Sequence, residues 1–158
     1  MKKIIFSIIL LLTSIVVSAN LSNSIGTNGF NINNLERNKQ NVIAFYDLMF
    51  NKNSPAEAIA KYVGDTYIQH NPHVKDGKKG FIDYFNRMAK DYPGKKVTFK
   101  KVIAEKNMVV LHCLQEWPGD KNYAAIDIFR LSNEGKILEH WDVLQEVPSN
   151  SKNENSMF

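Results

Sequence analysis

The spacing of apolar residues changes half-way along the chain, and this change limits the possible folds more than any other feature. A helix is predicted over residues 35–50, because its apolar side chains recur at the i, i+3, i+4 and i+7 positions of one face. A second helix is predicted to begin at Ser54, with Pro55 at its first position, and to end near Gly64. A third is predicted over residues 78–90.

The second half of the sequence has β-branched and apolar runs separated by turn sequences, which is typical of antiparallel strands. Helices followed by strands predict an α+β domain, with three helices packed on one face of a curved, mostly antiparallel sheet. The four predicted strands span residues 97–105, 108–117, 123–131 and 136–145.

The first 19 residues have the features of a signal peptide. Two lysines precede an apolar run over residues 4–17, and Ala19 follows at a position that suits cleavage before Asn20. We therefore expect an exported protein, in the periplasm or outside the cell, with no stable membrane span after cleavage. The alternative is an uncleaved membrane anchor, for which 14 apolar residues are short.

The remaining chain is predicted to be one domain at residues 35–147, between a flexible lead-in (20–34) and a flexible tail (148–158). Loss of two lysines with the signal leaves 18 of the 20 basic residues against 16 acidic ones, so the net charge falls from +4 to about +2. Such a weak, scattered charge does not favour nucleic-acid binding. The single Cys113 excludes an intramolecular disulfide, and its apolar neighbours predict burial.

Three ionisable residues are predicted to meet on one face of the last hairpin. If its turn centres on Asn133 and Glu134, residues whose numbers sum to 267 are opposite each other, so Asp127 pairs with His140. Asp142 lies two residues further and therefore shares the face of His140. Carboxylates next to an imidazole in an apolar pocket are suited to general acid–base catalysis.

Other interpretations of these residues remain open. The cluster also fits a purely structural hydrogen-bond network, or a sheet edge at which Asp142 meets water. His70, at the end of an extended segment before Pro72, is typical either of a pocket rim or of a local hydrogen-bonding residue. These histidines and aspartates could ligate a metal, but the chain has no short-spacing ligand motif such as HExxH, so no metal is expected.

The chain resembles the SnoaL-like proteins of the nuclear transport factor 2-like superfamily over residues 36–147. The Gln-His-Asn-Pro segment and the His-Trp-Asp segment that follows a Gly-Lys turn are together fairly specific for this group. The residues that carry the resemblance are 67–72 (YIQHNP), 76–78 (DGK) with Phe81, 127–130 (DIFR) and 135–143 (GKILEHWDV).

This resemblance implies a cone-shaped fold around one cavity, with an extra strand supplied by residues 66–70 and a dimer formed through the outer sheet face. It implies cofactor-independent aldol cyclisation or isomerisation of a small apolar carbonyl compound. Asp142 would be the base, His140 or His70 the donor, and Asp127 would orient the histidine. The alternatives are an exported protein that binds a small hydrophobic ligand without turnover and a dimeric interaction module.

Overall fold

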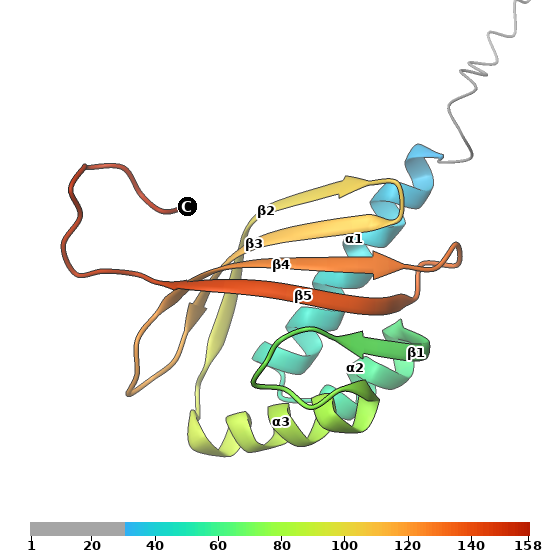
Figure 1. Cartoon of the computed structure of the whole chain (residues 1–158), viewed down its shortest axis with the longest axis horizontal. Coiled ribbons are helices and arrows are strands. Elements are labelled where there is room, and N and C mark those ends of the chain that lie inside the picture. Colours follow the sequence, from blue (N-terminus) through green and yellow to red (C-terminus); the bar gives the residue numbers. More distant parts are fainter. Residues whose placement is uncertain (1–30) are drawn as a thin grey trace, which may run out of the picture.

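The computed structural model describes residues 31–158. These residues form a five-stranded sheet with helices on one face (Figure 1). The expected α+β architecture of three helices and a curved sheet is confirmed. The predicted signal peptide and residues 20–30 of the predicted lead-in lie outside the described residues. Among the helices of the described part, none is both long and apolar enough to span a membrane.

The helices are close to the predicted ones. The first begins three residues before the predicted Leu35, because the Asn31 side chain caps it by accepting a hydrogen bond from the backbone N–H of Asn33. The second does not reach Gly64, since the chain becomes extended at Val63. The helices are α1 (Ile32–Tyr46), continued by the π-helical segment η1 (Asp47–Asn51), α2 (Pro55–Tyr62) and α3 (Gly77–Asp91).

The sheet has the order β1-β5-β4-β3-β2. The four strands from the second half of the chain form an antiparallel meander, and β1 is added parallel to β5 at the edge. The expectation that residues 66–70 supply a further strand is confirmed, because they lie mostly within β1. The strands are β1 (Val63–Gln69), β2 (Lys96–Glu105), β3 (Met108–Glu116), β4 (Tyr123–Leu131) and β5 (Ile137–Glu146).

The predicted register of the last hairpin is wrong by two residues. Asp127 pairs with Asp142 and Phe129 with His140, so paired numbers sum to 269 and not to 267. The turn is centred on Glu134, half a residue later than predicted, because the N–H of Ser132 donates to the carbonyl of Lys136, and this moves each pairing partner by one residue. A register shift near Arg130 moves the partners by one more residue. Since side chains alternate with a period of two, this shift leaves all three ionisable residues on one face.

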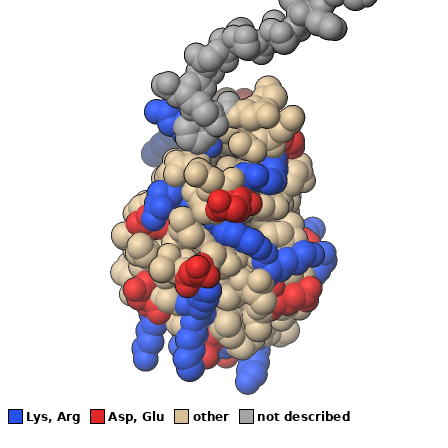
Figure 2. Space-filling view, turned by 90° about the vertical axis from the view of Figure 1, so that its right-hand side faces the viewer, with Lys and Arg blue, Asp and Glu red and all other residues tan. Residues whose placement is uncertain are grey.

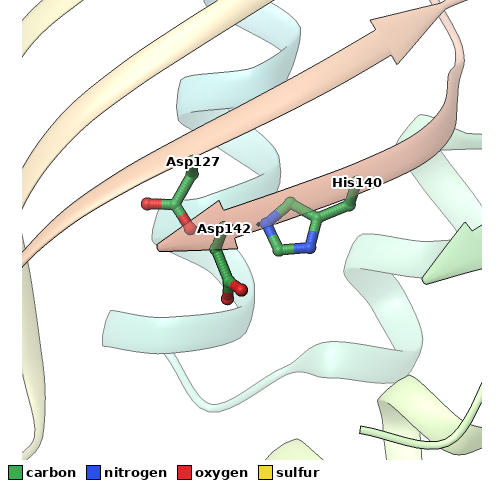
Figure 3. A group of neighbouring side chains, drawn as sticks. All are labelled: Asp127, His140 and Asp142. Carbon is green, nitrogen blue, oxygen red and sulfur yellow. Dashed lines mark hydrogen bonds and ion pairs between the residues drawn. The ribbon is translucent and has the colours of Figure 1, made fainter. Parts of the chain in front are cut away.

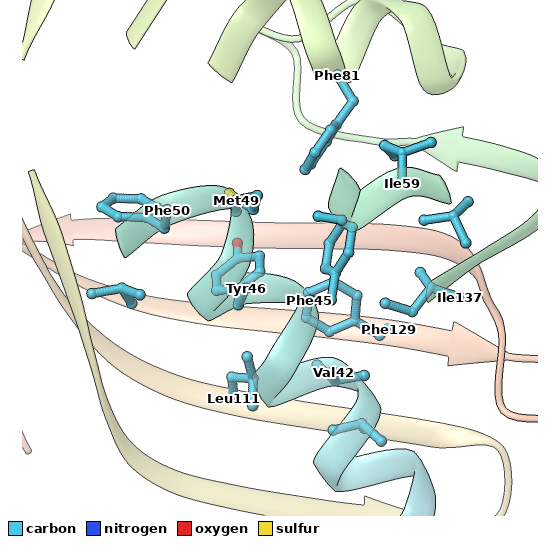
Figure 4. Packing of buried hydrophobic residues seen from close by; sticks show 14 of the residues in the cluster. Val42, Phe45, Tyr46, Met49, Phe50, Ile59, Phe81, Leu111, Phe129 and Ile137 are labelled. Atoms are coloured by element: carbon cyan, nitrogen blue, oxygen red, sulfur yellow. The ribbon is translucent and has the colours of Figure 1, made fainter. Parts of the chain in front are cut away.

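Aromatic side chains join the helices to the concave face of the sheet (Figure 4). Phe45 of α1 stacks on Phe81 of α3, with ring centroids 5.3 Å apart, and meets Phe129 of β4 edge-on at 6.2 Å. Cys113 is buried in this core, as predicted. This packing places the last turn of α1 directly over the middle of β4 and β5.

The opposite face of the sheet has no helix over it in the described part of the chain (Figure 1). The predicted flexible tail has no helix or strand, but its last residue contacts the sheet: the ring of Phe158 stacks on His112 at 5.4 Å. On the side of the molecule shown in Figure 2, basic and acidic side chains are interspersed.

Two glycines with the same backbone conformation provide a test of how closely α1 packs on the last hairpin. Gly135 (φ +82°) and Gly119 (φ +85°) both have positive φ, but a Cβ at Gly135 would lie 2.7 Å from Arg37 Nε, whereas Gly119 faces open space. Gly119→Ala is expected to cost about 1–2 kcal/mol in unfolding free energy, from backbone strain alone.

Gly135→Ala is expected to lower the unfolding free energy by about 1–2 kcal/mol more than Gly119→Ala does, because α1 would lose its hydrogen bonds to the turn. These bonds run from Arg37 to the Asn133 carbonyl (2.7 Å) and from Asn41 to the Gly135 carbonyl (2.9 Å). Urea unfolding of the two variants measures the difference; equal losses would contradict the close packing.

Candidate functional site

Asp127, His140 and Asp142 form a polar cluster on the face of the sheet that α1 covers (Figure 3). Asp127 comes from β4 and the other two from β5, and one ligand-type atom of each lies within 4.8 Å of the others. Asp127 is 0% exposed and His140 is 4% exposed, whereas Asp142 is half-buried. The cluster therefore extends from the core towards solvent.

The Asp127 carboxylate is held by groups from two elements. The Tyr46 hydroxyl, at the end of α1, donates a short hydrogen bond to its Oδ1, and the same oxygen lies 3.3 Å from His140 Nε2. Its Oδ2 is buried and has no hydrogen-bond partner in the described part of the chain. Burial and the adjacent Asp127 raise the pKa of Tyr46 well above its ordinary value, so the phenol stays a proton donor.

The edge strand β1 fixes the proton on His140. The backbone N–H of Asn71 donates to Gln69 Oε1 (2.9 Å), which defines the orientation of that amide. His140 Nδ1 lies 2.9 Å from the same oxygen and must therefore carry a proton. A hydrogen bond between His140 Nε2 and Asp127 Oδ1 requires one further proton between those two atoms. Both ring nitrogens are thus engaged within the protein.

Asp142 is held at the edge of the cluster by Asn71. The Asn71 amide donates to Asp142 Oδ1 (3.0 Å) and to Oδ2 (2.7 Å). Burial raises the pKa of Asp142 above its ordinary value of 3.8, although the bond from Asn71 and the nearby His140 act in the opposite direction. A carboxylate with a raised pKa is a stronger base when ionised.

Two adjacent pockets open at Asp142. The outer pocket has a volume of about 430 Å³, and the inner pocket, lined also by Tyr46, Gln69 and His140, has about 50 Å³. The larger volume is in the range of small-molecule sites. Both pockets are lined by Asn71, Tyr84, Trp117, Asp142 and Leu144.

Two polar side chains of the inner pocket keep hydrogen-bonding capacity for a ligand. Gln115 of β3 is 4% exposed and Tyr84 of α3 is half-buried. Within residues 31–158, neither the Gln115 amide nor the Tyr84 hydroxyl takes part in a side-chain hydrogen bond. Burial raises the pKa of Tyr84, and the Asp142 carboxylate adds to this, so the hydroxyl keeps its proton.

His70, one of the two histidines expected as donor, is not part of this cluster, and its contacts match the alternative of a local hydrogen-bonding residue. Its ring stacks on Trp141 at 4.7 Å, and its Nε2 lies 2.8 Å from Glu139 Oε1. Both partners alternate with His140 and Asp142 along β5 and therefore lie on the other face of the sheet. The parallel register pairs Gln69, and not His70, with His140.

Sequence reasoning singled out the Gln-His-Asn-Pro segment but chose the wrong member of it. Gln69 and Asn71 contact the cluster, and His70 between them points away. Tyr46 falls within the first predicted helix, but no sequence signal indicated the contact of its hydroxyl with Asp127. No sequence signal marked Tyr84 or Gln115, because their roles depend on which side chains border the pocket.

The cluster also offers three ligand-type atoms to a metal ion. His140 Nε2 and Asp127 Oδ1 face each other at 3.3 Å, and Tyr46 bonds the same oxygen. A cation bound by these atoms would have to replace that contact. This arrangement suits proton transfer between the residues more directly than metal ligation.

A family model for the SnoaL-like domain matches residues 42–140, which is more than half of the chain. The chain belongs to the SnoaL-like domain family. The match includes Tyr46, Gln69, Asn71 and Asp127 and ends at His140, two residues before Asp142. No curated protein matches the chain.

Solved structures share the nuclear transport factor 2-like fold at low sequence identity. TsrD from Streptomyces laurentii is 17% identical with a TM-score of 0.58, over 73% of this chain and 90% of TsrD. A Bacillus cereus protein, provisionally assigned as a polyketide cyclase, is 19% identical with a TM-score of 0.60, over 68% of this chain and 74% of that one. A Cytophaga hutchinsonii protein of this fold and of unknown function is 18% identical with a TM-score of 0.56, over 68% and 89% of the two chains.

The tautomer of His140 is a direct test of the site geometry. The nitrogen and carbon chemical shifts of the ring are expected to show a proton on Nδ1. Gln69→Leu removes the acceptor of that proton and is expected to change the His140 shifts, whereas His70→Leu, from the adjacent position on the other face, leaves them unchanged. Unchanged shifts in Gln69→Leu, or changed shifts in His70→Leu, would contradict the assignment.

Proposed function

We propose that this protein is a cofactor-independent acid–base enzyme that removes a proton next to a carbonyl group in a small, largely apolar compound. The observation that carries the proposal is Asp142: a carboxylate whose pKa is raised by burial, and which lines both pockets. The overall reaction would be an aldol cyclisation or an isomerisation. Structural similarity to a provisionally assigned polyketide cyclase supports this reaction class.

Asp142 is the proposed base because, of the two carboxylates in the cluster, it alone borders the pockets. Asp127 is fully buried and has Tyr46 and His140 on one oxygen. Asn71 holds both oxygens of Asp142 and so limits its rotation. In the proposed step, an Asp142 oxygen takes the proton from carbon, and the electron pair of the C–H bond moves to the carbonyl oxygen.

Tyr84 is the proposed donor to that oxygen. Tyr84 borders the same two pockets as Asp142, and its hydroxyl makes no side-chain hydrogen bond in the described part of the protein. A hydrogen bond from a phenol strengthens as charge develops on the substrate oxygen, which stabilises the enolate. His140, for which a donor role was expected, has both nitrogens engaged and is better placed as a positioning residue.

The proton taken by Asp142 then returns to the product. In an aldol cyclisation, the enolate carbon bonds to a second carbonyl of the same molecule, whose oxygen receives the proton. In an isomerisation, Asp142 returns the proton to another carbon. Neither route consumes an oxidant or a co-reactant.

Exchange of hydrogen for deuterium next to a carbonyl tests the proton-abstraction step without knowledge of the natural substrate. The purified protein is incubated with 2-tetralone in D₂O, and exchange is followed by NMR. Asp142→Asn is expected to slow exchange by about 10²–10⁴-fold, and Tyr84→Phe by about 10²-fold. Asp83→Asn is a matched control, since Asp83 is an exposed residue next to Tyr84 that pairs with Lys79; it should exchange at the wild-type rate.

The pH profile identifies the base. Exchange is expected to increase with pH as Asp142 loses its proton, with a midpoint above 3.8 because burial raises its pKa. The alternative, a ligand-binding protein without turnover, predicts that 2-tetralone binds and that no variant changes the exchange rate. That result would overturn the enzyme proposal.

Asp142→Asn is also expected to change how stability depends on pH. In the unfolded chain Asp142 titrates near 3.8, whereas in the folded protein its raised pKa keeps the proton to higher pH. Folding therefore becomes less favourable as pH rises through this interval. The asparagine variant has no such loss of stability. The difference in melting temperature, variant minus wild type, should therefore be more positive at about pH 7 than at about pH 3. The same difference at both pH values would contradict the raised pKa.

A further inference from the structure

Aromatic rings and carboxylates surround the outer pocket. Four of its lining residues are aromatic: Tyr84, Tyr92, Trp117 and Tyr123. All four are partly exposed. Tyr84 comes from α3, Tyr92 follows the end of α3, Trp117 lies between β3 and β4, and Tyr123 begins β4. Such rings supply apolar contact area, and their faces carry a negative potential that attracts cations.

Two of these rings are fixed by contacts with neighbours. Tyr92 and Trp117 meet edge-to-face with centroids 5.2 Å apart, and Trp117 also packs edge-on against Phe50 at 5.0 Å. The Tyr92 hydroxyl donates to Asp120 Oδ2 at 3.3 Å. The rings are thus oriented before any ligand arrives, which lowers the entropy cost of binding.

Two carboxylates line this pocket. Asp120 and Asp142 border it together with the titratable His73, and no lysine or arginine does so within residues 31–158. Neither aspartate has an ion pair with a lysine or arginine in the described part of the chain, although Glu146 nearby is paired with Lys121 at 2.6 Å. Both carboxylates accept hydrogen bonds from neutral groups, namely Asn71, Tyr92 and the backbone N–H of Lys121, and these bonds leave their negative charge in place.

One of these rings, that of Tyr84, already has a cation near it. The guanidinium carbon of Arg87 lies 5.3 Å from the centre of the Tyr84 ring, although Arg87 itself does not line the pocket. A ligand would use the rings of Tyr92, Trp117 and Tyr123.

From this arrangement we infer that the outer pocket binds the alkylated ammonium group of a small organic cation, between the aromatic rings and Asp120. Its volume of about 430 Å³ leaves room for the rest of the ligand to extend to Asp142. That the ligand also has a carbonyl group at Asp142 rests on the proposed function; the binding of the cation does not. The substrate would then be an amino ketone and not a neutral carbonyl compound.

A pair of ligands of equal shape separates charge from hydrophobicity. Choline and 3,3-dimethylbutan-1-ol differ in that the ammonium nitrogen of choline is replaced by carbon. In a Trp141→Phe background, Trp117 is the remaining tryptophan of the two in the chain and reports binding by its fluorescence. At constant ionic strength, choline is expected to change this fluorescence at a concentration about tenfold lower than the neutral alcohol.

Variants then locate the site. Tyr123→Leu is expected to weaken choline binding by about 5–30-fold, whereas Tyr123→Phe, which keeps the ring, retains it. Asp120→Asn is expected to weaken choline binding and leave binding of the alcohol unchanged. Equal affinity for the two ligands, absence of choline binding, or equal choline affinity in Tyr123→Leu and wild type would each overturn the inference.

Failure of this inference and of the proposed function can be told apart. Asp142→Asn is expected to slow deuterium exchange in 2-tetralone by about 10²–10⁴-fold, while choline still binds through the rings and Asp120. Choline binding without exchange in wild type would leave the inference intact and remove the enzyme proposal. Exchange without choline binding would overturn the inference and leave the enzyme proposal intact.

Discussion

The buried carboxylate of Asp127 is the constraint on which the rest of the site depends. An ionisable group without access to water is costly unless donors reach it, and here the donors come from α1 and from β5. Tyr46 has to end α1 directly over β4, and the helix changes to π-helical geometry at the next residue, Asp47. The aromatic packing of Phe45 between α3 and β4 holds the helix in that position. The core and the polar cluster therefore specify the same placement of α1.

The parallel edge strand β1 supplies the remaining contacts. Its last residue, Gln69, orients the ring of His140, and Asn71, just beyond the strand, holds Asp142. One short segment thus positions both residues that β5 contributes to the polar cluster. The backbone N–H of Asn71 also fixes the Gln69 amide, so the two contacts depend on each other. A change in the position of this segment would alter the inner pocket and the base together.

The sequence was sufficient to predict the α+β class, three helices and all strands of the meander, because apolar periodicity reports directly on which face of an element is buried. It also placed Asp127, His140 and Asp142 on one face, because a register error of two residues preserves the face. Two features could not be predicted from the sequence. Whether Gln69 or His70 faces the cluster depends on the register in which β1 pairs with β5, and this parallel pairing joins segments about 70 residues apart in the chain. The pocket role of Tyr84 depends on how α3 meets the sheet, which no local pattern encodes.

The polar groups around the two pockets divide into those that the protein satisfies and those that it leaves to a ligand. Oδ1 of Asp127, His140, Gln69 and Asn71 are bonded to one another or to neighbours, which makes the wall of the inner pocket rigid, whereas Oδ2 of Asp127 has no partner within residues 31–158. Tyr84 and Gln115 have no side-chain hydrogen bonds in the described part of the chain, and both line the inner pocket, where a ligand can reach them. A purely structural network would be expected to use these groups as well. Their availability beside Asp142, on an otherwise aromatic lining, therefore favours a site built to receive a polar end of a largely apolar molecule.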